Sequence, residues 1–377
     1  MPEILILCEY ATMNGGERSM ATTLDPVRAA GFSPVVAAPR EGPLADALAA
    51  RNMEHLPFDC QADGHRVPQA KLREQLATML EHRRPALLHA NSLAMGRLSG
   101  PVAARLELPS IAHLRDIIKL NRQAAADLNC HRRLLAVSNA VREYHISGGL
   151  SADKTYVLYN GVDLNEFRPR TPTGFLHRGL GLLKEGSSDV PLIATVGQIG
   201  LRKGQDVLLR AAAMLFERWP NVHYLVIGER HSQKEESRRF EGDLHRAAEQ
   251  SLPGRVHFLG RRDDMAAILS EVTLLVHPAR QEPLGRVLLE AAASGTAVVA
   301  ADVGGTREIF PPERDAARIV PPNDAEQLAA TISELLADGE LRTRLGNAAR
   351  QCGAERFDIR KTATALVRHY EALLQRP

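Results

Sequence analysis

Short apolar runs alternate with helical segments along almost the whole chain, and this alternation restricts the fold more than any other feature. Residues 4–8, for example, have the length and unbroken apolarity of a strand that is buried on both faces, and residues 192–196 differ only in Thr195. A segment of helical composition follows each of them before the next apolar run begins. Repeated strand–helix units of this kind predict an α/β fold, with parallel sheets covered by helices on both faces.

The same pattern gives the full set of predicted elements. The predicted strands are residues 4–8, 34–38, 55–58, 86–89, 110–113, 133–137, 155–158, 192–196, 222–227, 256–259, 273–276, 297–301 and 318–320. The predicted helices are residues 19–30, 42–51, 69–84, 96–106, 140–145, 207–219, 237–250, 324–336, 339–349 and 360–375, with further helices beginning at residue 265 and near residue 283.

The chain is too long for a single ordinary core. At 377 residues it fits two α/β domains of usual size. A turn-rich stretch around residues 160–174 and the polar residues 185–189 predict a domain boundary near residues 165–190. We therefore expect an N-terminal domain over residues 1–165 and a C-terminal domain over residues 190–359, each doubly wound around a parallel sheet.

Composition narrows the class of protein. Apolar residues make up 44% of the chain, charged residues make up 24%, and the net charge is +2, which is typical of a globular protein and gives no sign of nucleic-acid binding. The four cysteines form no Cys-x-x-Cys pair, which fits a reducing compartment and argues against a disulfide framework or a zinc site. No apolar run reaches the roughly 20 residues of a membrane span, and the N-terminal run is too short for a secretion signal. We expect a cytoplasmic protein, at most peripheral on the inner face of a membrane.

A strand, a helix and a second strand between residues 272 and 308 hold two carboxylates, Glu282 just before the helix and Glu290 inside it. Pro283 suits the first turn of this helix, where its missing N–H costs nothing, and Gly295 suits the C-terminal cap. The N–H groups expected to be free at the helix start belong to Leu284, Gly285 and Arg286. With the helix dipole they form a site for a phosphate or diphosphate.

The two glutamates restrict what such an anion could belong to. An anion would repel a carboxylate in front of the helix, so Glu282 is better suited to hydroxyl groups or to a developing cation. Glu290 could accept hydrogen bonds from a pair of hydroxyls. A diphosphate flanked by hydroxyl groups is the chemistry of a nucleotide sugar. The alternative is an ordinary amphipathic helix whose glutamate is solvated.

Another loop of the C-terminal half, residues 197–204, delivers Arg202 and Lys203 to the carboxyl end of a predicted strand. Two cations there could clamp a diphosphate, although the Gly-Lys-Ser/Thr of a Walker loop is missing. A solvated Arg-Lys pair is the alternative. Asp263 and Asp264 resemble a metal-binding pair, but an N-cap with a first-turn acid is the simpler interpretation, because a helix follows directly.

Two loops of the N-terminal half fall at the same edge of their predicted sheet. Gly15 and Gly16 place bare backbone after the first strand, without a Gly-x-Gly-x-x-Gly fingerprint, and a flexible turn is the alternative. His113, Arg115 and Asp116 follow a later strand and could orient one another around a polar ligand. As an isolated residue, a histidine such as His113 is more often structural.

Basic residues gather at two further places in the N-terminal half. They are Lys71, Arg73, Arg83 and Arg84 in one predicted helix and the run His131-Arg132-Arg133. Such patches could meet anionic lipid headgroups or a phosphorylated acceptor. Because Glu74 and Glu81 interrupt the first patch, a solvated helix face is the simpler interpretation.

Taken together, these residues resemble the GT-B glycosyltransferases of family 4, a large group of retaining enzymes, and the likeness spans almost the whole chain. It is carried by residues 15–18, 113–116, 137–138, 160–163, 197–204, 258–260, the pair Glu282 and Glu290, and residues 303–305. The resemblance implies two Rossmann-like domains facing across a cleft, with the acceptor bound by the N-terminal domain and the nucleotide sugar bound by the C-terminal domain. It also implies that the last helix, residues 360–377, packs back on the N-terminal domain and that no metal is needed.

The resemblance further implies roles for the site residues. Gly15 and Gly16 would lie near the donor phosphate, and His113 would contact the donor sugar. In the C-terminal domain Arg202 and Lys203 would hold the diphosphate. The remaining donor-binding residues would be Pro283, Leu284, Gly285 and Arg286 along the diphosphate, Glu282 at the sugar, Glu290 at the ribose, and Gly260 and Arg261 at the base.

Two departures from the family pattern bear on the donor. Gln198 stands where the family commonly has arginine, so the diphosphate clamp depends on Arg202 and Lys203. Pro283-Leu284-Gly285 replaces a common Gly-Phe-Gly, which affects donor preference.

The expected function is transfer of a sugar from a nucleotide-diphosphate donor to a carbohydrate or lipid-linked acceptor, in the synthesis of polysaccharide, lipopolysaccharide or glycolipid. The alternatives are a GT-B epimerase or phosphorylase that uses the same pocket, and a non-catalytic protein that binds sugar nucleotides or glycans.

Overall fold

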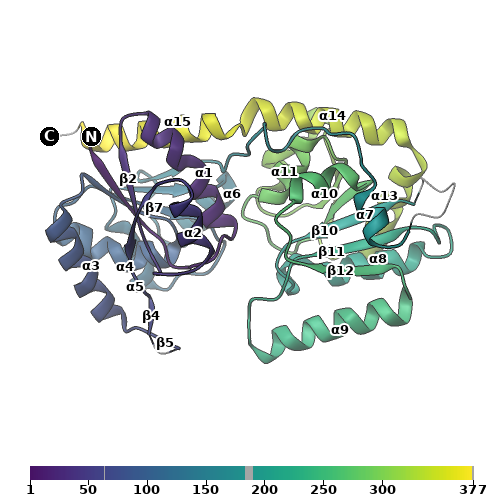
Figure 1. The fold of residues 1–377 in the computed structure, drawn as a ribbon, viewed down its shortest axis with the longest axis horizontal. Helices are drawn as coiled ribbons and strands as arrows, with labels where there is room; N and C mark the ends of the chain where they lie inside the picture. The colour runs from purple at the N-terminus through teal and green to yellow at the C-terminus, as the bar shows by residue number, and fades with distance from the viewer. Residues whose placement is uncertain (63, 183–189, 376–377) are drawn as a thin grey trace. The chain divides into compact units, whose positions relative to one another are not determined.

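The computed structural model describes residues 1–62, 64–182 and 190–375, and the chain divides into two compact α/β units (Figure 1). The first unit consists of Met1–Gly161 and the C-terminal segment from Ile359 onward, and the second unit is Val162–Asp358. The chain therefore returns to the first unit after completing the second.

A seven-stranded sheet forms the centre of the first unit, in the order β3-β2-β1-β6-β7-β8-β9, and all its neighbouring strands are parallel. β1 lies inside the sheet, because Leu5 pairs with Val35 of β2 on one side and with Leu88 of β6 on the other. The strands are β1 (Glu3–Leu7), β2 (Ser33–Ala38), β3 (Glu54–Pro57), β6 (Leu87–Ala90), β7 (Ser110–Leu114), β8 (Arg133–Ala136) and β9 (Thr155–Val157), and β4 (Gln61–Ala62) and β5 (His65–Arg66) form a separate antiparallel pair.

The C-terminal helix completes the core of the first unit. The helices of this unit are α1 (Gly15–Ala29), α2 (Pro43–Ala49), α3 (Gln69–Arg83), α4 (Leu93–Arg105), α5 (Arg122–Asn129), α6 (Asn139–Ser147) and α15 (Ile359–Leu374). Leu366, Tyr370 and Leu373 of α15 pack into the cluster that also holds Leu24 of α1. This apolar face on α15 accounts for its place in the first unit, since a helix within a protein gains most of its stability from such packing.

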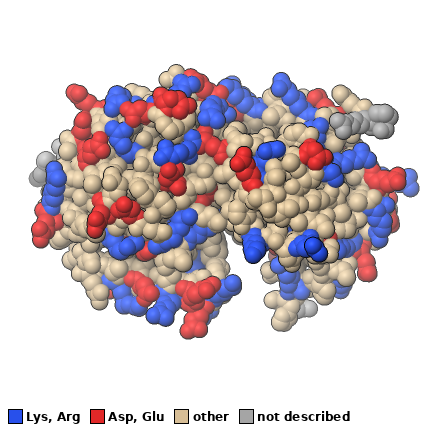
Figure 2. All heavy atoms as spheres, turned by 180° about the vertical axis from the view of Figure 1, so that it is seen from behind, with Lys and Arg blue, Asp and Glu red and all other residues tan. Residues whose placement is uncertain are grey.

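Positive and negative side chains are interspersed over the face shown in Figure 2, and no large area of one sign covers it. The predicted basic patch on α3 is partly neutralised, because Arg73 pairs with Asp127 at 2.8 Å and Arg83 pairs with Glu3 and Glu54, each at 2.7 Å. No helix in the described part of the chain has the length and apolarity needed to cross a membrane.

A six-stranded parallel sheet forms the centre of the second unit, in the order β12-β11-β10-β13-β14-β15. Its strands are β10 (Leu192–Val196), β11 (His223–Ile227), β12 (Val256–Gly260), β13 (Leu274–His277), β14 (Val298–Ala301) and β15 (Arg318–Val320). Its helices are α7 (Phe175–Gly179), η1 (Leu201–Lys203), α8 (Gln205–Leu215), α9 (Glu235–Ser251), α10 (Met265–Glu271), α11 (Arg286–Ser294), α12 (Thr306–Ile309), η2 (Pro312–Arg314), α13 (Ala325–Ala337) and α14 (Gly339–Arg356).

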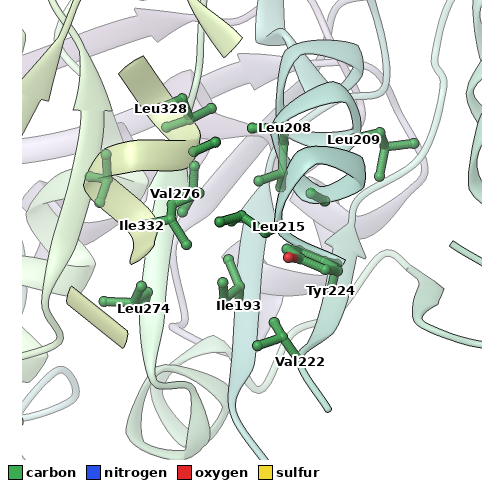
Figure 3. Close-up of a cluster of buried hydrophobic side chains, with 14 of the residues drawn as sticks. Ile193, Leu208, Leu209, Leu215, Val222, Tyr224, Leu274, Val276, Leu328 and Ile332 are labelled. Atoms are coloured by element: carbon green, nitrogen blue, oxygen red, sulfur yellow. The ribbon is translucent and has the colours of Figure 1, made fainter. Parts of the chain in front are cut away.

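The core of the second unit fixes the strands that carry its loops. Figure 3 shows Ile193, Tyr224 and Val276 of the sheet gathered with Leu208 of α8 and Ile332 of α13, and all of these side chains are buried. Burying a large apolar side chain contributes about 1.5–3 kcal/mol. β10 and β13 are therefore held firmly, and the loops that follow them start from fixed points.

The structure confirms the predicted fold class, since both sheets are parallel and doubly wound. Each predicted strand has a counterpart. The sequence pattern misses the β4–β5 pair, α5, α7, α12 and the short turns η1 and η2. The start of α5 is set by Asn121, whose side chain accepts a hydrogen bond from the N–H of Ala124, a signal that the apolar pattern does not contain.

Three predicted helix starts are wrong by three residues or more. α4 begins at Leu93 and not at residue 96. Gly15 and Gly16 lie in the first turn of α1 and not in a loop before it, with Asn14 as the N-cap residue. α11 begins at Arg286 and not near Pro283, because Gly285 adopts a left-handed conformation with φ of 99°, which no residue inside a right-handed helix can have.

Each sheet has one point where the direction of strand addition reverses. It lies between β1 and β6 in the first unit and between β10 and β13 in the second. Ligands of open α/β sheets bind outside the carboxyl ends of the strands at such a switch point.

Candidate functional site

A buried carboxylate, Glu282, joins the two loops at the switch point of the second unit. Its Oε2 atom accepts hydrogen bonds from Nζ of Lys203 at 2.5 Å and from Nε2 of His277 at 2.8 Å. Lys203 ends the turn η1 after β10, whereas His277 is the last residue of β13, so the pairing of these two strands brings the groups together. Only 8% of the Glu282 side chain and 15% of the Lys203 side chain are exposed.

The surroundings fix the charges in this cluster. Burial by itself would raise the pKa of Glu282, but the Lys203 ammonium and the hydrogen bonds from His277 and Lys203 outweigh burial and hold that pKa well below its ordinary value. Burial lowers the pKa of His277 despite the opposing effect of Glu282. Glu282 is therefore ionised at neutral pH. Within the described residues, its Oε1 atom accepts no hydrogen bond and remains available to a ligand.

The two loops are also clamped together away from the carboxylate. The guanidinium of Arg280 donates two hydrogen bonds of 2.7 Å to Asp206 and another of 2.7 Å to the carbonyl oxygen of Leu201. Gly204 has φ of 68°, and a Cβ atom there would overlap the carbonyl oxygen of Pro278. The loops therefore approach backbone to backbone, and this closeness holds Lys203 against Glu282.

The start of α11 lies next to this cluster. The N–H of Gly305 donates to the carbonyl oxygen of Glu282 at 3.2 Å, and Leu284 is buried. Since the helix begins at Arg286, the N–H groups of Arg286 and Val287 have no acceptor within the helix and carry the positive end of its dipole. The free N–H groups that the sequence places at Leu284, Gly285 and Arg286 therefore lie at Arg286 and Val287, after the Pro283-Leu284-Gly285 turn.

Glu290 forms a second, separate pair inside the same helix. Its Oε1 atom accepts a hydrogen bond of 2.7 Å from Nε of Arg286, four residues earlier. Nη1 of Arg286 is buried, and within the described residues it has no hydrogen-bond partner. A buried donor without a partner is costly, so this atom is a candidate for contact with a ligand oxygen. Glu282 and Glu290 share no hydrogen-bond partner among the described residues.

The remaining predicted residues of the second unit are exposed. The Arg202 side chain is open to solvent, and its backbone oxygen accepts a hydrogen bond of 2.8 Å from Arg280. Gly260 and Arg261 are exposed where β12 ends, and the oxygen of Gly260 accepts the N–H of Gly228 at 2.8 Å.

The acids that follow β12 are paired with arginines. Asp264 is the N-cap residue of α10 but makes no side-chain cap, because its carboxylate pairs with Arg262 at 2.6 Å. Its neighbour Asp263 lies 3.5 Å from Arg261. The prediction of an N-cap is therefore correct for the position of Asp264, but the side-chain hydrogen bond of such a cap is absent.

In the first unit, Arg115 organises the switch point. Its guanidinium donates to the backbone oxygen of Asn91 at 2.9 Å, to Oδ1 of Asn91 at 2.8 Å and to Oδ1 of Asn160 at 2.9 Å. It also packs on Gly16, where a Cβ atom would lie 3.2 Å from Cδ of Arg115. The loops after β6, β7 and β9 are thus tied to the first turn of α1.

His113 is buried next to Arg115 and belongs to a pair of histidines. Its Nδ1 atom lies 2.8 Å from Nε2 of His89, and Nδ1 of His89 lies 2.6 Å from the hydroxyl of Tyr370. Burial, with a contribution from the positive charge of Arg115, lowers the pKa of His89 to about 3 and that of His113 well below its ordinary value. Both rings are neutral at pH 7. Asp116, by contrast, is exposed, and its backbone oxygen lies 2.8 Å from Nε2 of His145.

The second predicted basic patch is wrong in part. His131 is fully buried, with Nδ1 2.9 Å from Oγ of Ser110 and Nε2 2.9 Å from the oxygen of Gly96. It is a core residue that links α4 to β7.

No role was predicted from the sequence for several residues of both switch points, namely His277, Arg280, Asp206, His89, Asn91, Asn160 and Tyr370. His277 and His89 had an available signal, since each is a polar residue at the carboxyl end of an apolar strand. Tyr370 had none, because it looks like any core residue of an amphipathic helix.

Comparison with known proteins shows which protein families the chain matches. Residues 184–352 match the family model described as glycosyl transferases group 1, and residues 13–166 match the model described as glycosyltransferase family 4.

Two curated relatives are enzymes of glycolipid synthesis by name. The chain is 32% identical to phosphatidyl-myo-inositol mannosyltransferase of Mycolicibacterium smegmatis over 244 residues, which is 63% of this chain and 57% of that protein. It is 33% identical over 203 residues to the GDP-mannose-dependent monoacylated alpha-(1-6)-phosphatidylinositol monomannoside mannosyltransferase of Corynebacterium glutamicum, which is 51% of this chain and 50% of that protein. The chain spans about half the length of the curated relatives it matches.

Solved structures share the fold over the whole chain. HepE of Anabaena in complex with UDP-glucose has a TM-score of 0.87 at 22% identity, over 99% of this chain and 100% of that one. A glycosyltransferase from Rickettsia africae has a TM-score of 0.85 at 19% identity, over 100% of this chain and 99% of that one. The two sheets of this protein therefore have the GT-B fold.

Proposed function

Because this chain belongs to the family 4 glycosyltransferases, we propose that it transfers a sugar from a nucleotide-diphosphate donor to an acceptor hydroxyl, with retention of configuration at the anomeric carbon. The observation that carries the proposal is the buried cluster of Lys203, Glu282 and His277 beside the start of α11. It combines a cation, a carboxylate with a free oxygen and unpaired backbone N–H groups at one switch point. This combination suits a diphosphate flanked by sugar hydroxyls.

In the proposed reaction the bond between the anomeric carbon and the diphosphate oxygen breaks, and the acceptor oxygen bonds to the same face of that carbon. Arg202, Lys203 and the N–H groups at the start of α11 would stabilise the charge that develops on the leaving diphosphate. The proton of the acceptor hydroxyl passes to a phosphate oxygen of the leaving group. Glu282 would accept sugar hydroxyls through Oε1, and its charge would stabilise the positive charge at the anomeric carbon.

The rest of the donor would extend along the second unit. Glu290 would accept the ribose hydroxyls while Arg286 holds its other oxygen in place. Gly260 and Arg261 would line the base through their main chain.

The first unit would bind the acceptor, and His113 would hydrogen-bond the transferred sugar. Gly15 and Gly16 lie in the first turn of α1, where N–H groups without an intrahelical acceptor suit a donor phosphate.

The names of the relatives indicate which substrates to try first. HepE was solved with UDP-glucose, and a relative is named for its dependence on GDP-mannose and for a phosphatidylinositol acceptor. We propose a UDP or GDP sugar as donor and a lipid-linked or polysaccharide acceptor at the cytoplasmic face of a membrane. Lys71 and Arg84, which are exposed on and beside α3, would supply peripheral contact with anionic lipid.

The test begins with thermal unfolding in the presence of UDP-glucose, GDP-mannose and ADP-glucose, with the free nucleotides as references. A donor at about 100 times its Kd should stabilise the fold by about 2.7 kcal/mol. The stabilising donor, labelled in its sugar, is then incubated with membrane lipid extracts, and transfer to lipid is measured with and without EDTA.

The expected result is labelled lipid whose new linkage keeps the donor's anomeric configuration by NMR, at the same rate with EDTA. Conversion of the donor without any acceptor would support an epimerase, and donor binding without turnover would support a binding protein. Either outcome would contradict the proposal.

A further inference from the structure

A line of hydrogen bonds runs through the first unit from the C-terminal helix to His113. The hydroxyl of Tyr370 lies 2.6 Å from Nδ1 of His89, and Nε2 of His89 lies 2.8 Å from Nδ1 of His113. Nη2 of Arg115 lies 3.3 Å from the same Nδ1 atom of His113. All three aromatic side chains are buried: Tyr370 is 0% exposed, His89 is 1% and His113 is 4%. The direction of each hydrogen bond can be worked out from its ends.

At one end, the phenol must donate. Within the described residues the Tyr370 hydroxyl has no hydrogen-bond partner except His89, and the side chain has no access to solvent. If Nδ1 of His89 carried the proton, the phenolic O–H would be a buried donor without an acceptor, which costs about 1–3 kcal/mol. The hydroxyl therefore donates to Nδ1 of His89, and the single proton of this neutral ring resides on Nε2.

At the other end, Arg115 must donate, because a guanidinium has no acceptor atom. Nδ1 of His113 therefore accepts from Arg115, and it can also accept from Nε2–H of His89. The opposite direction would place a proton on Nδ1 of His113 facing an N–H of Arg115. Both ends of the line thus require the same arrangement, and the single proton of His113 resides on Nε2.

The two histidines are neutral at pH 7, as this argument requires, because burial and the charge of Arg115 lower both pKa values. Within the described residues, Nε2 of His113 makes no hydrogen bond. The ring also lines a small cavity that Arg115 and Asn160 share at this edge of the sheet. Nε2–H is therefore the group that His113 can offer to a ligand.

We propose that Tyr370, acting through His89, and Arg115 together fix His113 as a hydrogen-bond donor. His113 then donates to an oxygen of the transferred sugar and cannot act as a base. Tyr370 is then a positioning residue for the site, supplied by the C-terminal helix. That the ligand is a sugar rests on the proposed function, whereas the position of the proton on His113 does not.

The position of the proton is tested without any substrate. Nitrogen-15 NMR of the full chain, labelled in histidine, distinguishes protonated from unprotonated ring nitrogens at pH 7.5, and the His89→Asn and His113→Asn variants assign the signals. We expect Nε2 protonated and Nδ1 unprotonated in both rings. A protonated Nδ1 in His113 would overturn the proposal whatever the enzyme does.

The role in transfer is tested with Tyr370→Phe, which removes only the hydroxyl and keeps the ring that packs against Phe32. Tyr224→Phe, at a buried tyrosine of the second unit, is the matched control. Losing one hydrogen bond in the line should lower kcat about fivefold in Tyr370→Phe, with the donor KM within about twofold of wild type. The Nδ1 signal of His113 should shift in Tyr370→Phe and stay unchanged in Tyr224→Phe.

Equal kcat in the two variants, or a His113 signal that ignores Tyr370, would contradict the positioning role. If the wild-type protein transfers no sugar at all, the proposed function fails, and the NMR measurements alone decide whether Tyr370 sets the state of His113.

Discussion

The two switch points of this protein have the same topology and opposite electrostatics. In the second unit, ionised partners meet directly, since Lys203 and Glu282 are 2.5 Å apart and Arg286 and Glu290 are 2.7 Å apart. In the first unit, neutral rings are hydrogen-bonded to one another, and Arg115, a cation next to His113, is held by amide and carbonyl oxygens of Asn91 and Asn160.

This difference follows from what each burial requires. A buried carboxylate stays ionised only if cations and hydrogen-bond donors offset its lost hydration, which Lys203 and His277 do. A buried histidine loses its charge more easily, because deprotonation leaves a neutral ring that can still donate and accept. The second unit is therefore suited to anion and charge stabilisation, and the first unit to recognition of neutral groups.

The largest expected effect comes from Glu282→Gln, which keeps the shape and removes the charge. If this carboxylate stabilises the transition state, kcat/KM should fall by about 10²–10³. The measurement is steady-state transfer, with Glu249→Gln on the exposed face of α9 as control. A variant within threefold of wild type would show that the ionic cluster has no catalytic part.

Lys203→Met should be the next largest change, because it leaves a buried carboxylate without its cation. We expect the second unit to lose about 2–3 kcal/mol of unfolding free energy at pH 7. Trp219, the only tryptophan and a residue of the second unit, reports this unfolding by fluorescence in urea. Lys234→Met, at an exposed lysine, is the control.

The loss of unfolding free energy in Lys203→Met should depend on pH. The folded pKa of Glu282 lies below its ordinary value of 4.5, so its contribution is complete above pH 4.5 and is lost as the pH falls toward the folded pKa. The deficit of Lys203→Met should therefore shrink in acid. A constant deficit from pH 7 to pH 4 would contradict the ionic account.

His89 should weaken the first unit at milder acidity than Glu282 weakens the second. His89 has a folded pKa of about 3 against an ordinary value of 6.5, so the unfolded chain binds a proton that the folded chain does not bind. The contribution of His89 to stability is complete above pH 6.5 and falls by about 1.4 kcal/mol per pH unit below it, or roughly 2 kcal/mol by pH 5. His89→Asn should show a smaller slope by far-UV circular dichroism, without a change in the Trp219 transition. An unchanged slope would exclude His89 as a source of the pH dependence.

The smallest effect is expected at the loop clamp of the second unit. Arg280→Lys replaces a two-pronged contact with Asp206 by a point charge, and the pair is partly exposed, so the cost should be about 1 kcal/mol by Trp219 fluorescence. Arg307→Lys, whose partner Asp302 is more exposed, should cost less. Equal costs would mean that the clamp does not hold the loops.

The loops of the candidate site were predictable because they follow strands, and strands are visible as apolar runs. Arg202, Lys203 and Glu282 were each assigned to the carboxyl edge of a sheet from their distance to such a run. The start of α11 was not predicted, since the left-handed conformation of Gly285 depends on its packing against Leu288 and on the Glu282 turn. Pro283 gave a valid local signal that this packing overrides.

By itself, the sequence determined the alternation of strands and helices, the doubly wound fold and the sheet edges at which the candidate site residues lie, because periodicity and loop position are local properties. Only the tertiary structure decided which groups meet. Lys203 and Glu282 are 79 positions apart, and His89 and Tyr370 are 281 apart. Such pairs form because strand order and the return of α15 bring distant segments together, and neither is encoded in the residues near either partner.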